Sequence, residues 1–224
     1  MSNNAHLALT RLLQLASPAL PVGAYSYSQG LEAAIEAGIV NDAPSAQRWI
    51  EDVLVLSIGG MEAPILLRLC DAWTAQDEAR ARHWNDLLLA SRESAELRAE
   101  TVQMGYSLVQ LLPELREAHP FESWDEVAFP SAFAFCAVRF GIEPREALIA
   151  YLWSWVENQV IAAVKAVPLG QSAGQRLLLA LGPRIVEQVD RSVALPDEAL
   201  ANMAPGLALL SAKHETQYSR LFRS

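Results

Sequence analysis

The residues of this chain that could bind a metal are few and scattered. Four histidines lie far apart in the sequence: His6, His83, His119 and His214. No HExxH, HxxxH or CxxC pattern occurs. A metal site needs three or four nitrogen, sulfur or oxygen ligands that converge on one point, and no local motif supplies them. We therefore expect no intrinsic metal site.

Catalytic and phosphate-binding patterns are equally weak. No GxxxxGK[ST] loop is present, and the nearest segment, residues 170–176 (GQSAGQR), lacks the Lys-Ser/Thr pair that holds phosphate and Mg²⁺. That segment is more typical of a turn followed by a helix start capped by Ser172 than of an anion-binding helix N-terminus. Glu32 and Glu36 lie four residues apart, as on the solvated face of a helix. The sequence predicts a protein that is not an enzyme and needs no cofactor.

Composition and charge narrow the class of protein further. The chain has 224 residues, 52% of them hydrophobic and 19% charged, and its net charge is −9. Such a chain can build a sizeable core, and its acidity argues against nucleic acid or an anionic membrane as a partner. Cys70 and Cys136 lie in apolar runs, typical of reduced, buried cysteines. We expect a soluble, cytoplasmic protein with no signal peptide and no membrane-spanning segment.

Helical patterns dominate the chain, and no strand-like alternation persists. We predict an all-α fold, a single-domain bundle of about ten helices. The segment 113–130 is expected to be a loop or a broken helix on the surface, and a proline-containing linker is expected to precede the C-terminal tail. Gly182-Pro183 should bend the last long helix. The predicted helices cover residues 9–16, 31–37, 44–55, 62–75, 77–89, 94–112, 130–140, 144–167 (the most apolar and therefore central one) and 172 onward.

Two segments stand out from this helical pattern. The first is residues 18–32, where Tyr25 and Tyr27 alternate with Ser26 and Ser28 in a loop bounded by proline and glycine. Tyrosine is rigid and amphipathic and is favoured in contact surfaces. The loop is either a binding surface or a well-packed interhelical connection, and the pattern alone does not separate the two.

The second segment is the C-terminal tail, residues 213–224. It carries three cationic residues and one anionic residue on an otherwise acidic chain. Helical spacing would place Tyr218, Leu221 and Phe222 on one face. These aromatic and arginine side chains are typical of interaction hot spots. The tail either binds a partner or docks on its own acidic body, and both can hold in turn.

With these two segments and a third, residues 165–175 (KAVPLGQSAGQ), the chain resembles the urease accessory protein UreF family. The matching blocks are residues 13–32 (LQLASPALPVGAYSYSQGLE), residues 165–175 and residues 214–224 (HETQYSRLFRS). They lie near both ends and in the late middle, in an order that fits the whole chain. Residues 66–130 carry no block of this kind.

The resemblance implies an all-α, dimeric protein without an active site of its own. Such proteins bind the accessory protein UreD (UreH in some systems) and the GTPase UreG, and together they deliver nickel to the urease apoprotein in a GTP-dependent manner. The resemblance thus implies a scaffold. The alternative is a GTPase-activating protein that supplies an arginine in trans, with Arg220 or Arg176 as candidates.

The resemblance also implies which residues bind partners. We expect a domain of residues 1–212 and an interaction tail of residues 213–224. The tail is predicted to be mobile in the free protein, to be ordered by UreD, and then to bring Arg220 close to the Tyr25 loop. The candidate partner-binding residues are Tyr25, Ser26, Tyr27, Ser28, Glu32, Lys165, Gln171, His214, Glu215, Tyr218, Arg220, Leu221, Phe222 and Arg223.

Overall fold

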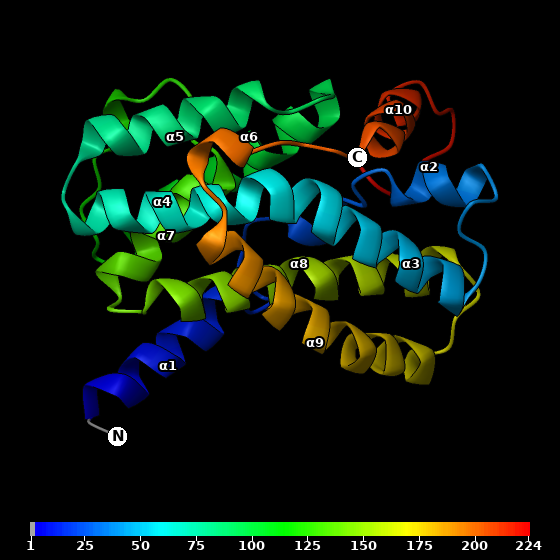
Figure 1. Ribbon diagram of the computed structural model, residues 1–224, viewed down its shortest axis with the longest axis horizontal. Helices are drawn as coiled ribbons and strands as arrows, with labels where there is room; N and C mark the ends of the chain where they lie inside the picture. The colour runs from blue at the N-terminus through cyan, green and yellow to red at the C-terminus, as the bar shows by residue number, and fades with distance from the viewer. Residues whose placement is uncertain (1–2) are drawn as a thin grey trace.

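A computed structural model describes residues 3–224, and within this range it contains helices and short 3-10 turns but no strand (Figure 1). The all-α prediction is therefore confirmed. The helices are α1 (Asn3–Leu15), α2 (Leu31–Glu36), α3 (Ala43–Val53), α4 (Ala63–Thr74), α5 (Glu78–Ala90), α6 (Ala95–Leu111), α7 (Phe129–Arg139), α8 (Pro144–Ala166), α9 (Gln171–Ala194) and α10 (Pro205–His214).

Helices α3 and α4 form one continuous rod, Ala43–Thr74, and the prediction of two separate helices there is wrong. A π-helical segment, Leu54–Glu62, joins them. Its free carbonyl groups accept hydrogen bonds from the chain after α9: Ala201 N donates to Gly60 O at 3.0 Å. A Cβ on Gly60 would lie 2.3 Å from the Ala201 carbonyl oxygen, so only glycine permits this approach. The residues described thus form nine separate helices.

Helix α8 lies at the centre of the bundle, as its apolar sequence predicts. It packs against α1, α2, α3, α4, α7 and α9. Tyr151, Leu152 and Val156 on α8 are buried in the main core. Two helices, Ala43–Thr74 and Pro144–Ala166, are long and apolar enough to cross a membrane, but about two thirds of each apolar stretch is buried inside the fold. Core helices of soluble proteins have the same composition.

The segment before α7 is more deeply packed than expected. Phe121 and Trp124 are buried, and their rings lie 5.6 Å and 5.8 Å from the ring of Trp73 on α4. The expectation of a surface loop is therefore wrong at these two residues, because aromatic burial outweighs the local polar composition.

The two cysteines lie in the core, as predicted. Cys70 on α4 and Cys136 on α7 are free and fully buried. Burial raises the pKa of each thiol to about 12, so neither residue is a thiolate at neutral pH. This agrees with a structural role.

The C-terminal part of the chain differs from the expectation in two ways. A helix, α10, begins at Pro205, where the sequence predicts only a linker. Residues 217–224 are not helical, so Tyr218, Leu221 and Phe222 do not share a helical face. Tyr218 and Leu221 are exposed and Phe222 is buried. In Figure 1, α10 and the end of the chain lie at the opposite end of the molecule from α1.

Candidate functional site

The two unusual segments of the sequence meet in the structure. The backbone N–H and the Oγ of Ser28 both donate to the carbonyl oxygen of Ser224, at 2.7 Å and 2.5 Å. The N–H of Arg223 donates to the carbonyl oxygen of Ser26 at 2.7 Å. The tail (residues 213–224) is therefore docked against the Tyr25 loop, although the two lie almost 200 residues apart.

Glu32 on α2 is the main acceptor for the docked tail. Its carboxylate accepts hydrogen bonds from the N–H groups of Leu221 and Phe222 at 2.7 Å and 2.9 Å. Glu32 is buried while Glu36 is exposed, so the prediction of a solvated carboxylate pair is wrong for Glu32. A buried carboxylate is stabilised only when donors replace its water, and here the tail provides them.

His214, the last residue of α10, lies between two carboxylates. Its side chain is fully buried, with Nε2 3.2 Å from Glu32 Oε2 and Nδ1 2.7 Å from Glu96 Oε2. Arg220 donates to the other oxygen of Glu96 at 2.7 Å. We call His214, Glu32 and Glu96, together with the Leu221 and Phe222 amides, the tail anchor.

Phe222 adds an apolar contact to the tail anchor. Its ring is buried in a small cluster with Leu31 and Val40. The Nζ of Lys165, in the last turn of α8, lies 5.8 Å from the centre of this ring, within the range of a cation–π contact. Lys165 thus belongs to the site that the sequence indicates, whereas Gln171 is an exposed residue at the start of α9.

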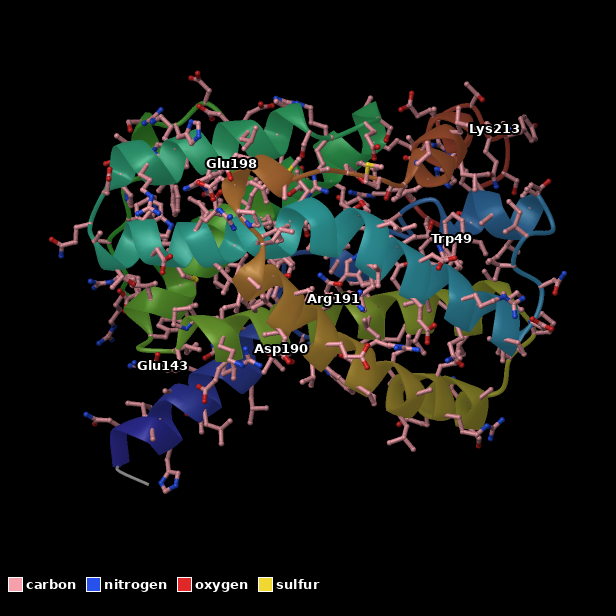
Figure 2. The ribbon with its side chains drawn as sticks, viewed as in Figure 1. Trp49, Glu143, Asp190, Arg191, Glu198 and Lys213 are labelled. Atoms are coloured by element: carbon pink, nitrogen blue, oxygen red, sulfur yellow. The ribbon has the colours of Figure 1, made fainter. Side chains whose placement is uncertain are left out.

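Above the anchor, exposed side chains form what we call the interaction face. Tyr25, Tyr218 and Leu221 expose 65%, 105% and 72% of their surface. Tyr25 and Leu221 line a shallow hollow together with Ser26, Lys165, Phe222 and Arg223. Lys213 on α10 is exposed and points outward (Figure 2). The face combines apolar and cationic groups on an acidic protein.

Three remaining candidate residues, Tyr27, Ser28 and Glu215, lie outside this face. Tyr27 and Ser28 are buried beneath it, and burial and the nearby Glu100 raise the pKa of Tyr27. They support the loop and are not accessible to a partner. Glu215 is exposed at the end of α10, and its Oε1 accepts a hydrogen bond from Ala95 N at 3.0 Å, which ties α10 to the start of α6.

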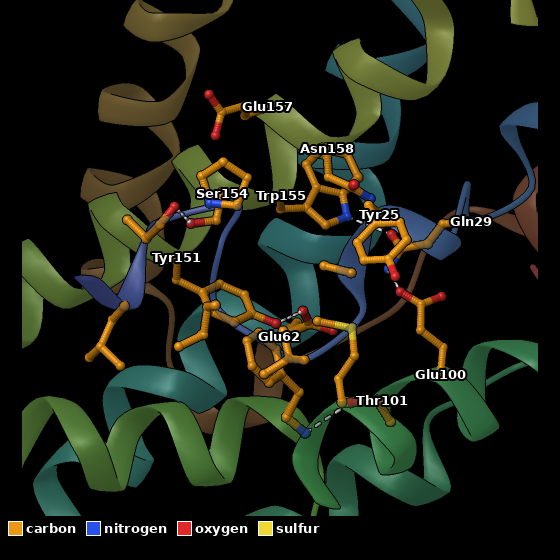
Figure 3. A pocket seen from close by; sticks show the side chains of 18 of the residues that line it. Tyr25, Gln29, Glu62, Glu100, Thr101, Tyr151, Ser154, Trp155, Glu157 and Asn158 are labelled. Atoms are coloured by element: carbon orange, nitrogen blue, oxygen red, sulfur yellow. Dashed lines mark hydrogen bonds between the residues drawn. The ribbon is translucent and has the colours of Figure 1, made fainter. Parts of the chain in front are cut away.

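A cavity of about 100 Å³ lies below the Tyr25 loop, between α6 and α8 (Figure 3). Tyr151 donates to Glu62 at its inner wall, and Arg92 pairs with the same carboxylate. We call Glu62, Arg92 and Tyr151 the core ionic cluster. Burial and the adjacent Glu62 carboxylate raise the pKa of Tyr151 well above its usual value, so Tyr151 stays neutral and donates.

Glu100 joins this cavity to the tail. Its carboxylate accepts hydrogen bonds from Gln29 Nε2 at 2.6 Å and from Ser224 Oγ at 2.9 Å, and Trp155 Nε1 donates to Gln29 Oε1 at 2.5 Å. Complete burial raises the pKa of Glu100 to about 7. These polar groups are satisfied by one another, as in a structural network.

The site contains no recognisable catalytic arrangement. Within residues 3–224 no group of three His, Cys, Asp or Glu side chains is placed to hold a metal ion. Residues 170–174 (GQSAG) have the spacing of a nucleophile elbow, but Ser172 is exposed in the first turn of α9, and no strand precedes it. A nucleophile elbow requires a strand-to-helix turn.

Sequence analysis missed three residues of the site: Glu96, Glu100 and Ser224. Glu96 and Glu100 lie four residues apart on α6, so one face of that helix carries both. That spacing is common on solvated helices and gives no signal of a binding role. Their function becomes visible only when the tail lies across α6.

The fold and the site thus define an all-α protein whose C-terminal tail is docked against the Tyr25 loop. A family model for UreF matches residues 40–182. Proteins named urease accessory protein UreF are 55% identical in Azoarcus sp. (strain BH72) and in Dechloromonas aromatica (strain RCB). These alignments cover 97% of this chain and 96% and 98% of the relatives, respectively. The chain belongs to the UreF family of urease accessory proteins.

Proposed function

We propose that this chain is a scaffold subunit for urease maturation in the cytoplasm. With UreD (UreH) and the GTPase UreG it promotes GTP-dependent insertion of nickel into the urease apoprotein. Its family membership supports a role beside urease. The observation that carries the proposal is the interaction face, where Tyr25 and Leu221 line one hollow and remain exposed, and where Tyr218, three residues before Leu221, is exposed as well, although a folded chain gains by burying such side chains.

The composition of this face suits binding to another protein. Tyrosine and arginine are enriched at the energetic centres of interfaces, and a hydrated rim of charges sets orientation and association rate. The cationic residues Lys165 and Arg223 line the same hollow as Tyr25 and Leu221. A partner with an acidic, partly apolar surface would complement this arrangement.

The docked tail gives the face its shape, so we propose that partners bind the chain in this docked state. In this state Arg220 donates a hydrogen bond to Glu96. The alternative function, a GTPase-activating arginine in trans, needs a guanidinium that is free to reach the nucleotide. The pair with Glu96 makes Arg220 the less suited of the two candidate arginines, whereas Arg176 is exposed on α9 and stays the candidate for this alternative function.

We place the homodimer contact at the other end of the molecule. Helix α1 leaves the body at an angle (Figure 1) and exposes Leu9 and Leu13, and α8 exposes Ile149 and Trp153. Trp49 on α3 is half-buried and packs on the core, which makes it less suited to a dimer contact. A dimer through α1 and α8 would leave the interaction face free.

The test of the proposed function removes side chains from the interaction face without undocking the tail. The double variant Tyr218→Ala/Leu221→Ala should fold normally, because both side chains are exposed. It should lose co-purification with UreD and UreG and should lower urease activation. Leu179→Ala, an equally exposed residue on α9, is the matched control. Unchanged complex formation by the double variant would contradict the proposal.

A further inference from the structure

The guanidinium of Arg92 has more hydrogen-bond donors than the protein provides acceptors for. Only 10% of its side chain is exposed, and its Nη2 pairs with Glu62. Its Nε–H is buried as well and has no acceptor among residues 3–224. A buried donor without a partner is costly, and Arg92 lines the cavity below the Tyr25 loop. An acceptor atom inside the cavity would satisfy this donor.

Glu100 lines the same cavity and has the opposite need. Its carboxylate accepts hydrogen bonds from two neutral groups, Gln29 Nε2 and Ser224 Oγ, whereas a carboxylate has about four acceptor sites. Complete burial raises the pKa of Glu100 to about 7, and Arg92 is close enough for its charge to oppose this rise. The ionised form of Glu100 therefore gains from each further N–H donor.

The size and the walls of the cavity limit what it holds. A cavity of roughly 150 Å³ holds one benzene ring in another protein, so a volume of about 100 Å³ has room for about four non-hydrogen atoms. The side chains of Met104, Phe129, Tyr151 and Trp155 line it (Figure 3). Because aromatic rings stack on flat groups, these walls favour a small planar occupant.

Other classes of occupant would satisfy only part of this site. A metal ion needs several ligands, and no group of three His, Cys, Asp or Glu side chains is placed for one in the part of the chain that the structure describes. An anion would face the carboxylates of Glu62 and Glu100. A cation would leave Arg92 Nε without an acceptor. An apolar molecule would leave both Arg92 and Glu100 unsatisfied.

We propose that this cavity binds a small primary amide, whose carbonyl oxygen accepts a hydrogen bond from Arg92 Nε and whose N–H groups donate to Glu100. An amide group is planar and uncharged, and it carries an acceptor and two donors on one carbon atom. Tyr25 is exposed and lines both this cavity and the hollow of the interaction face. The occupant therefore enters beside the Tyr25 loop and lies next to that face.

Four small molecules of nearly equal size test the chemistry of the site. Acetamide carries both functions, acetone lacks the N–H groups, acetamidinium lacks the acceptor, and acetate replaces the donors with negative charge. Each is titrated into the isolated chain at pH 8, above the pKa of Glu100, which is about 7. Proton–nitrogen NMR follows the indole N–H of Trp155, which donates to Gln29 at the cavity wall.

Acetamide should shift the Trp155 indole resonance in a saturable way. The dissociation constant should lie between about 0.1 and 10 mM, because so small a ligand makes few contacts. Acetone, acetamidinium and acetate should each bind at least about tenfold more weakly, because each leaves a buried charged group without its partner.

Two variants locate the binding site. Arg92→Lys keeps the positive charge beside Glu62 but removes Nε, and should weaken acetamide binding at least about tenfold. Ala24→Leu adds volume at a half-buried residue that lines the cavity, and should abolish the shift without changing Arg92 or Glu100. Ala180→Leu, at an exposed position on α9, is the matched control and should bind acetamide as the wild type does.

Several results would overturn the proposal. Equal binding of all four molecules would mean non-specific occupancy of the cavity, and tighter binding of acetamidinium would mean a cation site. No saturable shift with acetamide, or wild-type binding by Ala24→Leu, would overturn it as well. Because only the isolated chain is used, each of these results leaves the proposed function to its own test.

Discussion

The core ionic cluster and the tail anchor solve the same physical problem in different ways. Each buries carboxylates that water can no longer stabilise. Glu62 is held by Arg92 and Tyr151, which belong to the body of the bundle. Glu32 is held by donors that the last eleven residues of the chain bring across its surface.

The difference concerns when each set of donors is present. Arg92 lies in the turn between α5 and α6, and Tyr151 lies on the central helix, so their contacts with Glu62 form with the fold itself. The donors to Glu32 are present only while the tail is docked. Burying an unpaired charge is costly, so the tail that covers Glu32 must also supply its hydrogen-bond donors.

The largest expected effect breaks the core ionic cluster. Arg92→Met would leave Glu62 buried with Tyr151 as its only hydrogen-bond donor, and should lower the free energy of unfolding by about 3–5 kcal/mol. Urea denaturation followed by circular dichroism measures this. Arg145→Met, which breaks an exposed pair with Asp190, is the control and should change stability little. A small effect of Arg92→Met would show that Glu62 does not depend on donors from the body of the fold.

The next effect concerns Glu100, which lies between the two clusters. Its pKa is about 7 in the folded chain and 4.5 when unperturbed, so between these values the folded state binds more protons than the unfolded state. Stability should therefore fall as the pH rises through this window, by about 3 kcal/mol from this group. Glu100→Gln should remove that fall. Identical pH profiles of unfolding for wild type and variant would contradict the expectation.

A smaller effect is expected when the apolar part of the tail contact is removed. Phe222→Ala loses a buried ring and should weaken docking by about 2 kcal/mol, because burial of such a side chain contributes roughly 1.5–3 kcal/mol. That shift changes the docked-to-undocked ratio by roughly 30-fold. Tryptic cleavage after Arg220 should rise accordingly, while the melting of the helical body stays near that of the wild type. Loss of the whole fold would show that tail and body are not separable.

The smallest effect sharpens the comparison within the tail anchor. Arg220 is about 39% exposed, so its pair with Glu96 is screened by solvent and Arg220→Ala should weaken docking by less than about 1 kcal/mol. Amide exchange at Leu221 measures this change. If the same variant abolishes partner binding while the tail stays docked, Arg220 contacts the partner itself. Complete release of the tail would instead make Arg220 the principal anchor.

Much of the fold could be predicted from local patterns. Asp42, Asp77 and Ser94 cap α3, α5 and α6, each by accepting a hydrogen bond from the N–H three residues further on. Such signals lie within one helical turn and are visible in the sequence. The continuous rod of α3 and α4 was not predictable, because Gly59 and Gly60 normally weaken a helix. The distant segment around Ala201 occupies the carbonyl groups of the π-helical segment instead.

The candidate site, like the fold, could be predicted from the sequence only in part. The composition of the tail and of the Tyr25 loop distinguishes both from the rest of the chain. The sequences of these two segments also indicate the family by resemblance. The sequence by itself determined most of the helices, the apolar central helix and these two segments, since each depends on neighbouring residues. Only the tertiary structure decided that Glu32 is buried and that His214 lies between Glu32 and Glu96. Those contacts join residues more than a hundred positions apart, and local spacing carries no information about such pairs.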